Sequence, residues 1–318
     1  MDTTSVGIDV SKDWLDVGVR PTGERFRVSR DAEGLGSLVA RLVPLAPRVV
    51  AVEATGGYES VVAATLAAAG LPVVVVNPAQ VRAFAQALGK RAKTDPIDAG
   101  VIAHFVEATK PEVRALPDAE TRRLADLVAR RRQIIQMIVA ERQRQKRLTE
   151  PRLQRSIARL LAALQKELSS LESDIDDAVR DSAAWRAKED LLTSVPGIGK
   201  TIARTLLAEL PELGTLDRRK AAALSGLAPW TRQSGQWKGK SFIGGGRASV
   251  RSALFVGAMV AARHNPELKA FRDRLVDAGK PKLVALVATA RKLLTILNAI
   301  LRDGQPWQEG HAHAAGSS

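Results

Sequence analysis

The order of apolar runs in the first 90 residues is the feature that most constrains the fold. Apolar residues alternate with polar ones or run continuously in segments that are typical of strands. The segments between and after them have the composition and spacing of helices. The predicted strands cover residues 6–10, 14–19, 26–30, 48–53 and 71–76, and the predicted helices cover 33–42, 58–69 and 78–88. The order β-β-β-α-β-α-β-α predicts an α/β domain that begins with a hairpin.

Acidic residues at two positions of these predicted strands are candidate ligands. Asp9 interrupts an apolar strand pattern, where acids are disfavoured. Glu53 ends a continuous apolar run, at the strand end where α/β sheets place ligand-binding groups. Each has an ordinary alternative role: Asp9 could bond the backbone of the turn that follows, and Glu53 could cap the next helix. Acids on the first strand, the fourth strand and a later helix are typical of a ribonuclease-H-like nuclease domain.

The later helix begins in the segment KTDPIDA, residues 93–99. Proline suits the first turn of a helix, so Asp95 is expected at or beside the N-cap, with Asp98 three residues on and on the same face. Two converging carboxylates suit a divalent cation, and Mg²⁺ prefers one or two such ligands with water and phosphate oxygens. The alternative is an N-cap acid and a second acid favoured by the helix dipole. Together with Asp9 and Glu53, the pair predicts a metal site that acts on a phosphodiester.

The charge of the chain is distributed unevenly. The net charge is +14, but residues 1–108 carry 11 Lys and Arg against 12 Asp and Glu. Residues 109–185 carry 16 against 12, and residues 186–302 carry 21 against 8. The excess in the last third indicates that a polyanion is held there, and nucleic acid is favoured over a merely solvated basic surface.

Composition also excludes several classes of protein. The chain has no cysteine, which excludes disulfides and thiolate metal sites. It has no basic, apolar leader at its start and no uncharged apolar window of 18 residues. These features predict a cytoplasmic protein with no membrane partner.

Residues 118–180 have the pattern of two long helices. Apolar residues recur at helical spacing over 124–139 and again over 157–179, and Thr149-Glu150-Pro151 separates the two stretches. The pattern predicts a coiled-coil-like helical hairpin. Arg130, Arg131 and Arg142 give its first half a basic face, which suits nucleic-acid contact and helix packing in a homo-oligomer equally well.

The basic last third contains two candidate phosphate-binding segments. The segment SVPGIGKT, residues 194–201, lacks the glycine spacing of a nucleotide-binding P-loop and resembles a helix-hairpin-helix turn. Residues 224–247 interleave Gly, Trp, Lys and Arg, as in loops that contact nucleic acid. The predicted nucleic-acid-binding residues are Lys93, Arg130, Arg131, Arg142, Lys200, Arg232, Lys238, Lys240, Arg247 and Arg251.

Hydroxyl groups of the same region are candidate nucleophiles. A serine attacks a phosphodiester only if it is activated and if the developing charge is neutralised. Residue chemistry alone does not select among the four serines of this region, which are Ser234, Ser241, Ser249 and Ser252. One helix is predicted over 248–264, and two more over 269–302, separated at Lys280-Pro281-Lys282. His311 and His313 lie in a small-residue tail that is expected to be disordered.

The motifs of the chain together resemble one known family. GIDVSK (7–12), EATGGY (53–58) and KTDPIDA (93–99) are similar to the motifs of the DEDD transposases of bacterial insertion sequences, the IS110 family, which includes Piv-type DNA invertases. VPGIG (195–199), GLAP (226–229) and Ser234-Gly235 resemble the C-terminal transposase domain of that family. The resemblance covers residues 5–302.

The resemblance implies an α/β plus α architecture. Residues 1–110 would form a RuvC-like, RNase H-like catalytic domain, and 111–185 a coiled-coil arm. Residues 186–307 would form a mainly α transposase domain with the helix-hairpin-helix-like turn, and 308–318 a disordered tail. The catalytic and Mg²⁺-binding acids would be Asp9, Glu53, Asp95 and Asp98, and Ser234 would be the nucleophile that joins covalently to DNA.

The resemblance also implies partners. Members of the family are thought to use a structured non-coding RNA, the bridge RNA, as a guide that pairs with donor and target DNA. The active complex would be a homo-oligomer, a dimer that assembles into a tetramer. Ile243-Gly244-Gly245 stands where many relatives have Ile-Ser-Lys, which removes a serine that would compete with Ser234. The acids and Ser234 are expected to meet as one composite site, within one chain or across subunits.

Two other functions fit the same residues. A metal-dependent junction nuclease that hydrolyses with water would need the four acids but not Ser234. A non-catalytic nucleic-acid-binding protein would use the acids only structurally. Tyr58, the only tyrosine, lies at a predicted helix start, where packing or positioning is favoured over nucleophilic attack.

Overall fold

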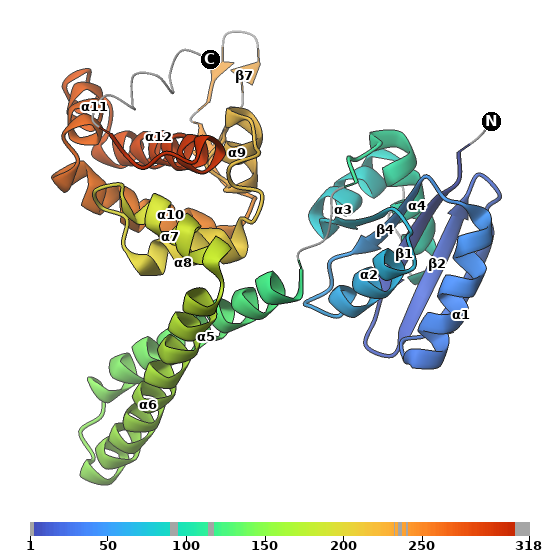
Figure 1. Cartoon of the computed structure of the whole chain (residues 1–318), viewed down its shortest axis with the longest axis horizontal. Helices are drawn as coiled ribbons and strands as arrows, with labels where there is room; N and C mark the ends of the chain where they lie inside the picture. Colours follow the sequence, from blue (N-terminus) through green and yellow to red (C-terminus); the bar gives the residue numbers. More distant parts are fainter. Residues whose placement is uncertain are drawn as a thin grey trace. The chain divides into compact units, whose positions relative to one another are not determined.

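A computed structural model describes residues 3–89, 95–113, 118–231, 233–234, 237–239 and 241–308. The chain divides into two compact units, Met1–Leu116 and Pro117–Ser318, and each is described by itself (Figure 1). The first unit is a mixed sheet with helices on both faces, and the second is helical with short β-ladders.

The sheet of the first unit has the strand order β3-β2-β1-β4-β5. Strands β1, β2 and β3 form an antiparallel meander, and β4 and β5 continue the sheet parallel to β1. The bounds are Ser5–Val10 for β1, Trp14–Arg20 for β2, Arg25–Ser29 for β3, Val49–Glu53 for β4 and Val73–Val76 for β5. The order of elements predicted from the apolar runs is confirmed.

Helices cover the two faces of this sheet because side chains alternate along each strand. The even-numbered residues of β1 face α1 (Ala32–Leu42) and α2 (Glu59–Ala68), where Leu38 and Leu66 are fully buried. A short 3-10 turn, Val43–Leu45, follows α1. The opposite face packs against α3 (Pro78–Ala87) and α4 (Asp95–Thr109), with Ile102 and Val106 of α4 in its core.

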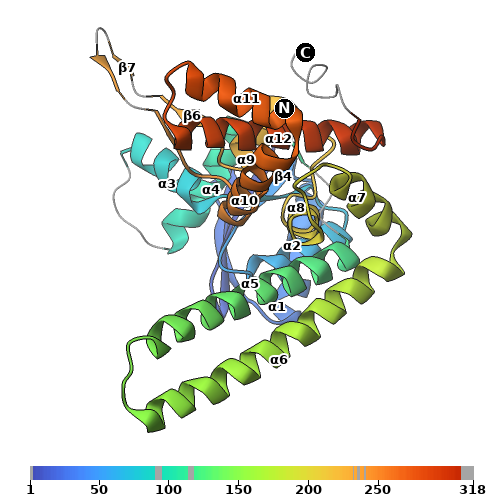
Figure 2. The same ribbon diagram turned by 90° about the vertical axis from the view of Figure 1, so that its left-hand side faces the viewer.

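The second unit begins with a pair of long helices. Helices α5 (Ala119–Gln145) and α6 (Pro151–Asp181) lie side by side and extend away from the other helices of this unit (Figure 2). The Glu150 side chain caps α6 by accepting from the Leu153 N–H at 2.7 Å, and Pro151 occupies the first turn. The two-helix hairpin is therefore confirmed, and it is called the arm below.

Apolar side chains join the arm to the rest of the unit. Ile134, Ile138, Leu161 and Leu171 form a layer between the two helices of the arm. A second apolar layer lies at the base of the arm. Its side chains from the arm are Leu124, Val128, Ile175 and Val179. Because Ala208 of α8 is also part of this layer, the layer joins the arm to the helical domain.

The helical domain is built around α12. Its apolar face, with Leu293, Leu297 and Ile300 fully or almost fully buried, contacts α7, α9, α10 and α11. The bounds are Ala183–Thr193 for α7, Lys200–Glu209 for α8, Arg218–Leu224 for α9, Ala248–His264 for α10, Pro266–Asp277 for α11 and Lys282–Asp303 for α12. Among the described residues, α12 is long and apolar enough to cross a membrane, but half of its apolar window is buried in this domain, as in a core helix.

Short antiparallel ladders connect α9 to α10. Strand β6 (Pro229–Trp230) pairs with β9 (Phe242–Ile243), and β7 (Gln233–Ser234) pairs with β8 (Trp237–Lys238). The Trp230 and Phe242 rings are nearly parallel, with an interplanar angle of 12° and centroids 6.4 Å apart. The β7–β8 hairpin therefore extends from the β6–β9 ladder.

Candidate active site and nucleic-acid surface

Asp9 and Glu53 lie beside each other at one edge of the sheet. The parallel strands β1 and β4 pair Ile8 with Val52, and Asp9 and Glu53 are the next residue on each strand. Adjacent strands are about 4.8 Å apart, and side chains in step point to the same face. Both residues are half-buried, and both follow the alternation that faces α3 and α4.

Helix α4 brings Asp98 to the same edge. The helix runs antiparallel to β1, because Glu107 near its end pairs at 2.6 Å with Arg20, which lies opposite Ser5 at the start of β1. The first turn of α4 must therefore lie toward the carboxyl ends of β1 and β4. Asp98 stands in that turn and is half-buried, while the side chain of Asp95 lies outside the described residues.

Two glycines allow α4 to lie directly on the sheet. A Cβ on Gly7 would come within 2.2 Å of the Ala103 N and 2.4 Å of the Ala99 O. A Cβ on Gly18 would meet the backbone of Ala99 and Gly100 at 2.9 Å. The backbone contact fixes the height of α4 above the sheet, and with it the position of Asp98 near the ends of the strands.

Neighbouring side chains stabilise the turns that follow β1 and β4. The turn after β1 is held by Ser11, whose hydroxyl accepts from the Trp14 N–H at 3.1 Å. The loop before α2 is held by Glu59, whose carboxylate accepts from the N–H groups of Thr55 and Gly57 at 2.9 Å.

The acidic edge has the chemistry of a Mg²⁺ site, because its donors are carboxylates on three separate segments. Within the described part of the chain, no three Asp, Glu or His side chains are grouped closely enough to hold a metal ion, and the fourth predicted ligand, Asp95, is outside that part. The backbone therefore brings Asp9, Glu53 and Asp98 to one edge without a closed ligand cluster.

Ser234 lies in the second unit, in strand β7, and its side chain is exposed. Two other candidate serines are engaged within the protein: the Ser249 hydroxyl bonds the Glu209 carboxylate, and the Ser252 hydroxyl donates to the Ala248 carbonyl at 2.9 Å. Ser241 lies 3.5 Å from the Thr231 hydroxyl. Ser234, Ser241 and Ser252 are all exposed, so exposure alone does not select one of them. Tyr58, the other hydroxyl considered as a nucleophile, is exposed in the first unit. The Arg30 guanidinium lies over the Tyr58 ring, 4.6 Å from the ring centroid.

The predicted nucleic-acid-binding residues are distributed over both units. Arg130 and Arg142 are exposed on α5, and Lys200 is exposed at the start of α8. Arg247 forms a two-pronged pair with Glu212 at 2.6 and 2.7 Å, and Arg251 donates to the Gly245 carbonyl at 2.5 Å. Lys93, Arg232, Lys240 and the Lys238 side chain lie outside the described residues.

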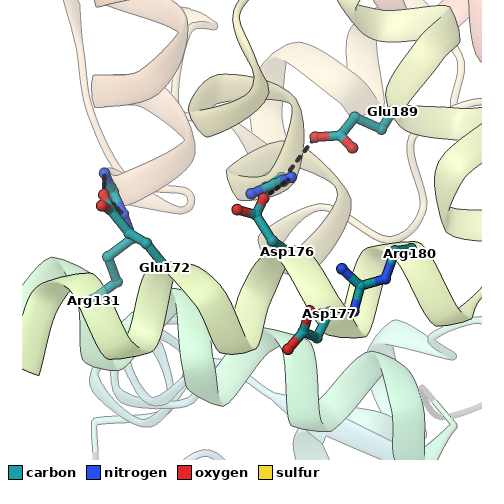
Figure 3. Close-up of polar contacts among 7 residues, drawn as sticks. Arg131, Glu172, Asp176, Asp177, Arg180 and Glu189 are labelled. Atoms are coloured by element: carbon teal, nitrogen blue, oxygen red, sulfur yellow. Dashed lines mark hydrogen bonds and ion pairs between the residues drawn. The ribbon is translucent and has the colours of Figure 1, made fainter.

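Ion pairs surround a cavity at the base of the arm. Arg131 of α5 pairs with Glu172 of α6 at 2.7 Å, and Arg204 of α8 bonds Asp176 at 2.6 Å and Glu189 at 2.7 Å (Figure 3). The cavity, about 830 Å³, is also lined by Lys200. Burial opposes the charge of Arg204, but its bonds to Glu189 and Asp176 outweigh burial and raise its pKa.

Two glycines of the candidate phosphate-binding segments lie in close backbone contacts. A Cβ on Gly197, in the turn between α7 and α8, would come within 2.5 Å of the Ala261 N of α10, and its φ is 102°. A Cβ on Gly246 would come within 2.4 Å of the Gly226 N. Gly199, by contrast, is exposed, and no atom lies within 4 Å of the position that a Cβ on it would take. It is therefore the glycine of this turn that has no close packing contact there.

Sequence reasoning missed a second cavity in the helical domain. It is lined by Arg218 of α9, Phe271 of α11 and the consecutive cations Arg291 and Lys292 of α12. The sequence feature that could have indicated this cavity is the adjacent pair of cations, Arg291 and Lys292, on a helix whose face is otherwise apolar.

Comparisons with known proteins agree on one family. Residues 6–151 match a model of the IS110 DEDD type described as transposase, and residues 189–273 match the transposase IS116/IS110/IS902 family. The pilin gene-inverting proteins of Moraxella lacunata and Moraxella bovis are each 27% identical over 97% of this chain and 99% of their own length. An uncharacterized 43.6 kDa protein of insertion element IS110 from Streptomyces coelicolor is 32% identical over 47% of this chain and 36% of its own length.

Proposed function

We propose that this chain cleaves and exchanges DNA strands through a covalent serine–DNA intermediate. The premise is that the chain belongs to the IS110 family of transposases. The membership itself assigns a transposase or recombinase function on DNA. The finer proposal assigns Ser234 as the nucleophile and Asp9, Glu53, Asp95 and Asp98 as the metal-binding acids.

The observation that carries the proposal is the convergence of acids at one sheet edge. Asp9 and Glu53 end adjacent parallel strands, and α4 begins at the same edge with Asp98. The sheet order β3-β2-β1-β4-β5, with acids at the ends of β1 and β4, supports an RNase H-like, RuvC-like domain. Ligand sites of open α/β sheets lie at such carboxyl ends.

The proposed reaction exchanges one phosphate ester for another. The Ser234 oxygen forms a bond to phosphorus, the P–O bond to one DNA strand breaks, and the released DNA oxygen is protonated. The serine–DNA ester retains the energy of the phosphodiester, so attack by a second DNA hydroxyl rejoins the strand and regenerates the serine without ATP.

Mg²⁺ is the cofactor that this donor set would hold. When bound by Asp9, Glu53, Asp95 and Asp98, it would favour the deprotonated hydroxyl and neutralise the charge that develops on the phosphate. The carboxylates of this chain hold and orient the cation, and Ser234 supplies the attacking oxygen. The reaction requires the acids and Ser234 to act on one phosphodiester, within one chain or between two copies.

The remaining parts of the proposal concern partners. The basic second unit and residues such as Arg130, Arg142 and Lys200 would contact donor and target DNA and a structured guide RNA. The arm would arrange subunits in a dimer and in a tetrameric active complex in the cytoplasm. The two relatives matched over nearly their whole length are named for inverting a pilin gene, which is also a rearrangement of DNA.

A suicide substrate tests the serine intermediate directly. A nicked DNA that loses its released strand would trap wild-type protein as a covalent adduct in Mg²⁺. We expect Ser234→Ala to abolish the adduct while its folding and RNA binding stay intact, and Ser241→Ala to keep the adduct. An adduct on Ser234→Ala would exclude this serine. Cleavage without any adduct would favour a nuclease that uses water.

The acids are tested by the same assay. Asp9→Asn should lose both cleavage and adduct because the cation is no longer held, while affinity for DNA measured in EDTA stays within about twofold. If Asp9→Asn leaves every activity intact, the acids are structural and the chain is a binding protein.

A further inference from the structure

The cavity missed by sequence reasoning lies beneath the β6–β9 ladder. Its volume is about 470 Å³, within the 300–1,000 Å³ range of small-molecule sites. Helices α9, α11 and α12 form one side, and the paired residues Pro229 and Ile243 form the other. The apolar walls also include Leu227, Phe271 and Val287, so a flat apolar group fits this space.

The charged groups at this cavity are all cationic. Arg218, Arg291 and Lys292 line it, and none of the described lining residues is Asp or Glu. The cavity at the base of the arm differs, because Glu172 and Asp176 are among its lining residues. The apolar cavity therefore has a positive rim that an anionic ligand would complement.

Phe271 and Lys292 form the centre of the site. The Lys292 ammonium lies 5.1 Å from the centroid of the Phe271 ring, and the Arg274 guanidinium lies 5.5 Å from the same centroid. Burial and the nearby Arg274 lower the pKa of Lys292, and Glu267 opposes them. A nearby anion would favour the charged form of this amine.

We propose that this cavity binds one unstacked nucleotide of a single-stranded nucleic acid, with the base against Phe271 and the apolar walls and a phosphate at Arg218, Arg291 and Lys292. Aromatic stacking and cationic contact to phosphate are the usual means of holding single strands. A base inside a duplex is stacked on both faces and would not enter.

The location links this site to the proposed chemistry, on which the inference rests. The chain between β6 and β9 contains Ser234, and Pro229 and Ile243 form the wall of the cavity. A nucleotide held there is anchored at the base of the segment that presents the serine. The site would therefore fix the register of an unpaired strand relative to Ser234.

Photocrosslinking identifies the occupant. Single-stranded DNA and RNA of one sequence, each with a single 5-iodouracil, are irradiated with the full-length protein in EDTA, and the crosslinked peptides are mapped by mass spectrometry. We expect a crosslink to Phe271 from the DNA, from the RNA or from both. The nucleic acid that crosslinks is the one that the cavity binds. Crosslinks confined to other segments would overturn the proposal.

Two variants test the cavity without removing the serine or the acids. Ala288→Phe would fill the cavity, and Lys292→Met would remove one cation while keeping the aliphatic stem. Each should weaken single-strand binding at least about fivefold in EDTA and leave duplex affinity unchanged. Leu283→Phe, on the 63% exposed Leu283 of α12, and Lys269→Met, on exposed α11, are matched controls that should bind as wild type.

The outcomes separate this inference from the proposed function. If folded Ala288→Phe and Lys292→Met bind single strands as wild type does, the cavity does not hold a nucleotide. If instead they alter the sedimentation mass with unchanged affinity, a second copy of the chain occupies it. If Ala288→Phe fails to fold, Lys292→Met and the wild-type crosslink decide. The serine adduct is scored separately in Mg²⁺, so either result can fail alone.

Discussion

Gly7 shows how one residue positions part of the candidate active site. It has no side chain because α4 lies on the backbone of β1 at this point, one turn from Asp98. Asp9 stands two residues further along the same strand and on the same face. Gly7 is not a predicted ligand of the metal, but its contact with α4 sets the distance between Asp9 on the sheet and Asp98 on the helix.

Gly7→Ala should destabilise the first unit. The new Cβ would lie 2.2 Å from the Ala103 N, a backbone atom that moves only if α4 moves. We expect a loss of about 1–3 kcal/mol in the free energy of unfolding, as for other overpacked sites. Urea unfolding followed by circular dichroism measures it.

Gly36→Ala is the matched control for this prediction. Gly36 is exposed in α1 and has nothing within 4 Å of the position that a Cβ would take, so alanine should leave stability unchanged or raise it by up to about 1 kcal/mol. Equal effects of the two substitutions would contradict the close packing of α4 on β1.

At the level of elements, Arg204 joins three helices at the base of the arm. Its guanidinium, on α8, bonds Asp176 of α6 and Glu189 of α7, and the Arg204 and Glu189 side chains are only 12% and 8% exposed. Arg204→Met would leave the Glu189 carboxylate buried without this partner. We expect a loss of about 3–5 kcal/mol in the free energy of unfolding, measured in urea.

Two further variants make that prediction specific. Arg204→Met combined with Glu189→Met should regain much of the loss, because an apolar pair replaces the charges. Arg180→Met removes an exposed pair with Asp177 on α6 (Figure 3) and should cost less than about 1 kcal/mol. A cost at Arg180 as large as that at Arg204 would show that burial does not set the difference.

The start of α5 gives a prediction for pH. The N–H and the hydroxyl of Thr121 lower the pKa of Asp118, the N-cap, below its usual value. A carboxylate with a lowered folded pKa stabilises the protein above its unfolded pKa, near 3.9, and this stabilisation is lost as the pH falls through the folded pKa. Asp118→Asn keeps the cap but does not titrate.

Urea unfolding between pH 6 and pH 3 measures the effect. The stability advantage of wild type over Asp118→Asn should be constant from pH 6 to about pH 5 and should shrink below about pH 4. A difference that stays constant down to pH 3 would mean that the Thr121 contacts do not depend on the charge of Asp118.

Local sequence predicts the elements well because it determines where apolar side chains fall along a strand or helix. The runs around Asp9 and Glu53 were recognisable as strands, and Pro96 marked the start of α4. Contacts between distant segments were not recognisable. Gly197 and Gly246 lie in the two segments predicted to bind phosphate, and nothing in the sequence indicated that they also lie in close backbone contacts with α10 and with Gly226. The cavity at Phe271 combines five segments that show no common pattern in sequence.

At the level of the whole molecule, the proposed metal-binding acids and the proposed nucleophile lie in different units. The first is nearly neutral and holds the acids, and the second is strongly basic and holds Ser234. Binding of nucleic acid by the basic unit should weaken steeply with salt, because each neutralised phosphate releases counterions. In the proposed function the acids hold the cation and not the nucleic acid, so we expect affinity and catalysis to be separable by mutation.

Mixing two inactive variants determines whether one active site draws on two subunits. Asp9→Asn retains Ser234, and Ser234→Ala retains the acids, so neither forms a serine adduct alone. If the serine of one subunit works with the acids of another, co-expressed and differently tagged chains should form adducts again, and only on the Asp9→Asn chain. The yield should be about a quarter to a half of wild type, since mixed oligomers form by chance. Mixed complexes that assemble but form no adduct would place the acids and the serine of each site in the same chain, and an adduct on the Ser234→Ala chain would contradict the serine mechanism itself.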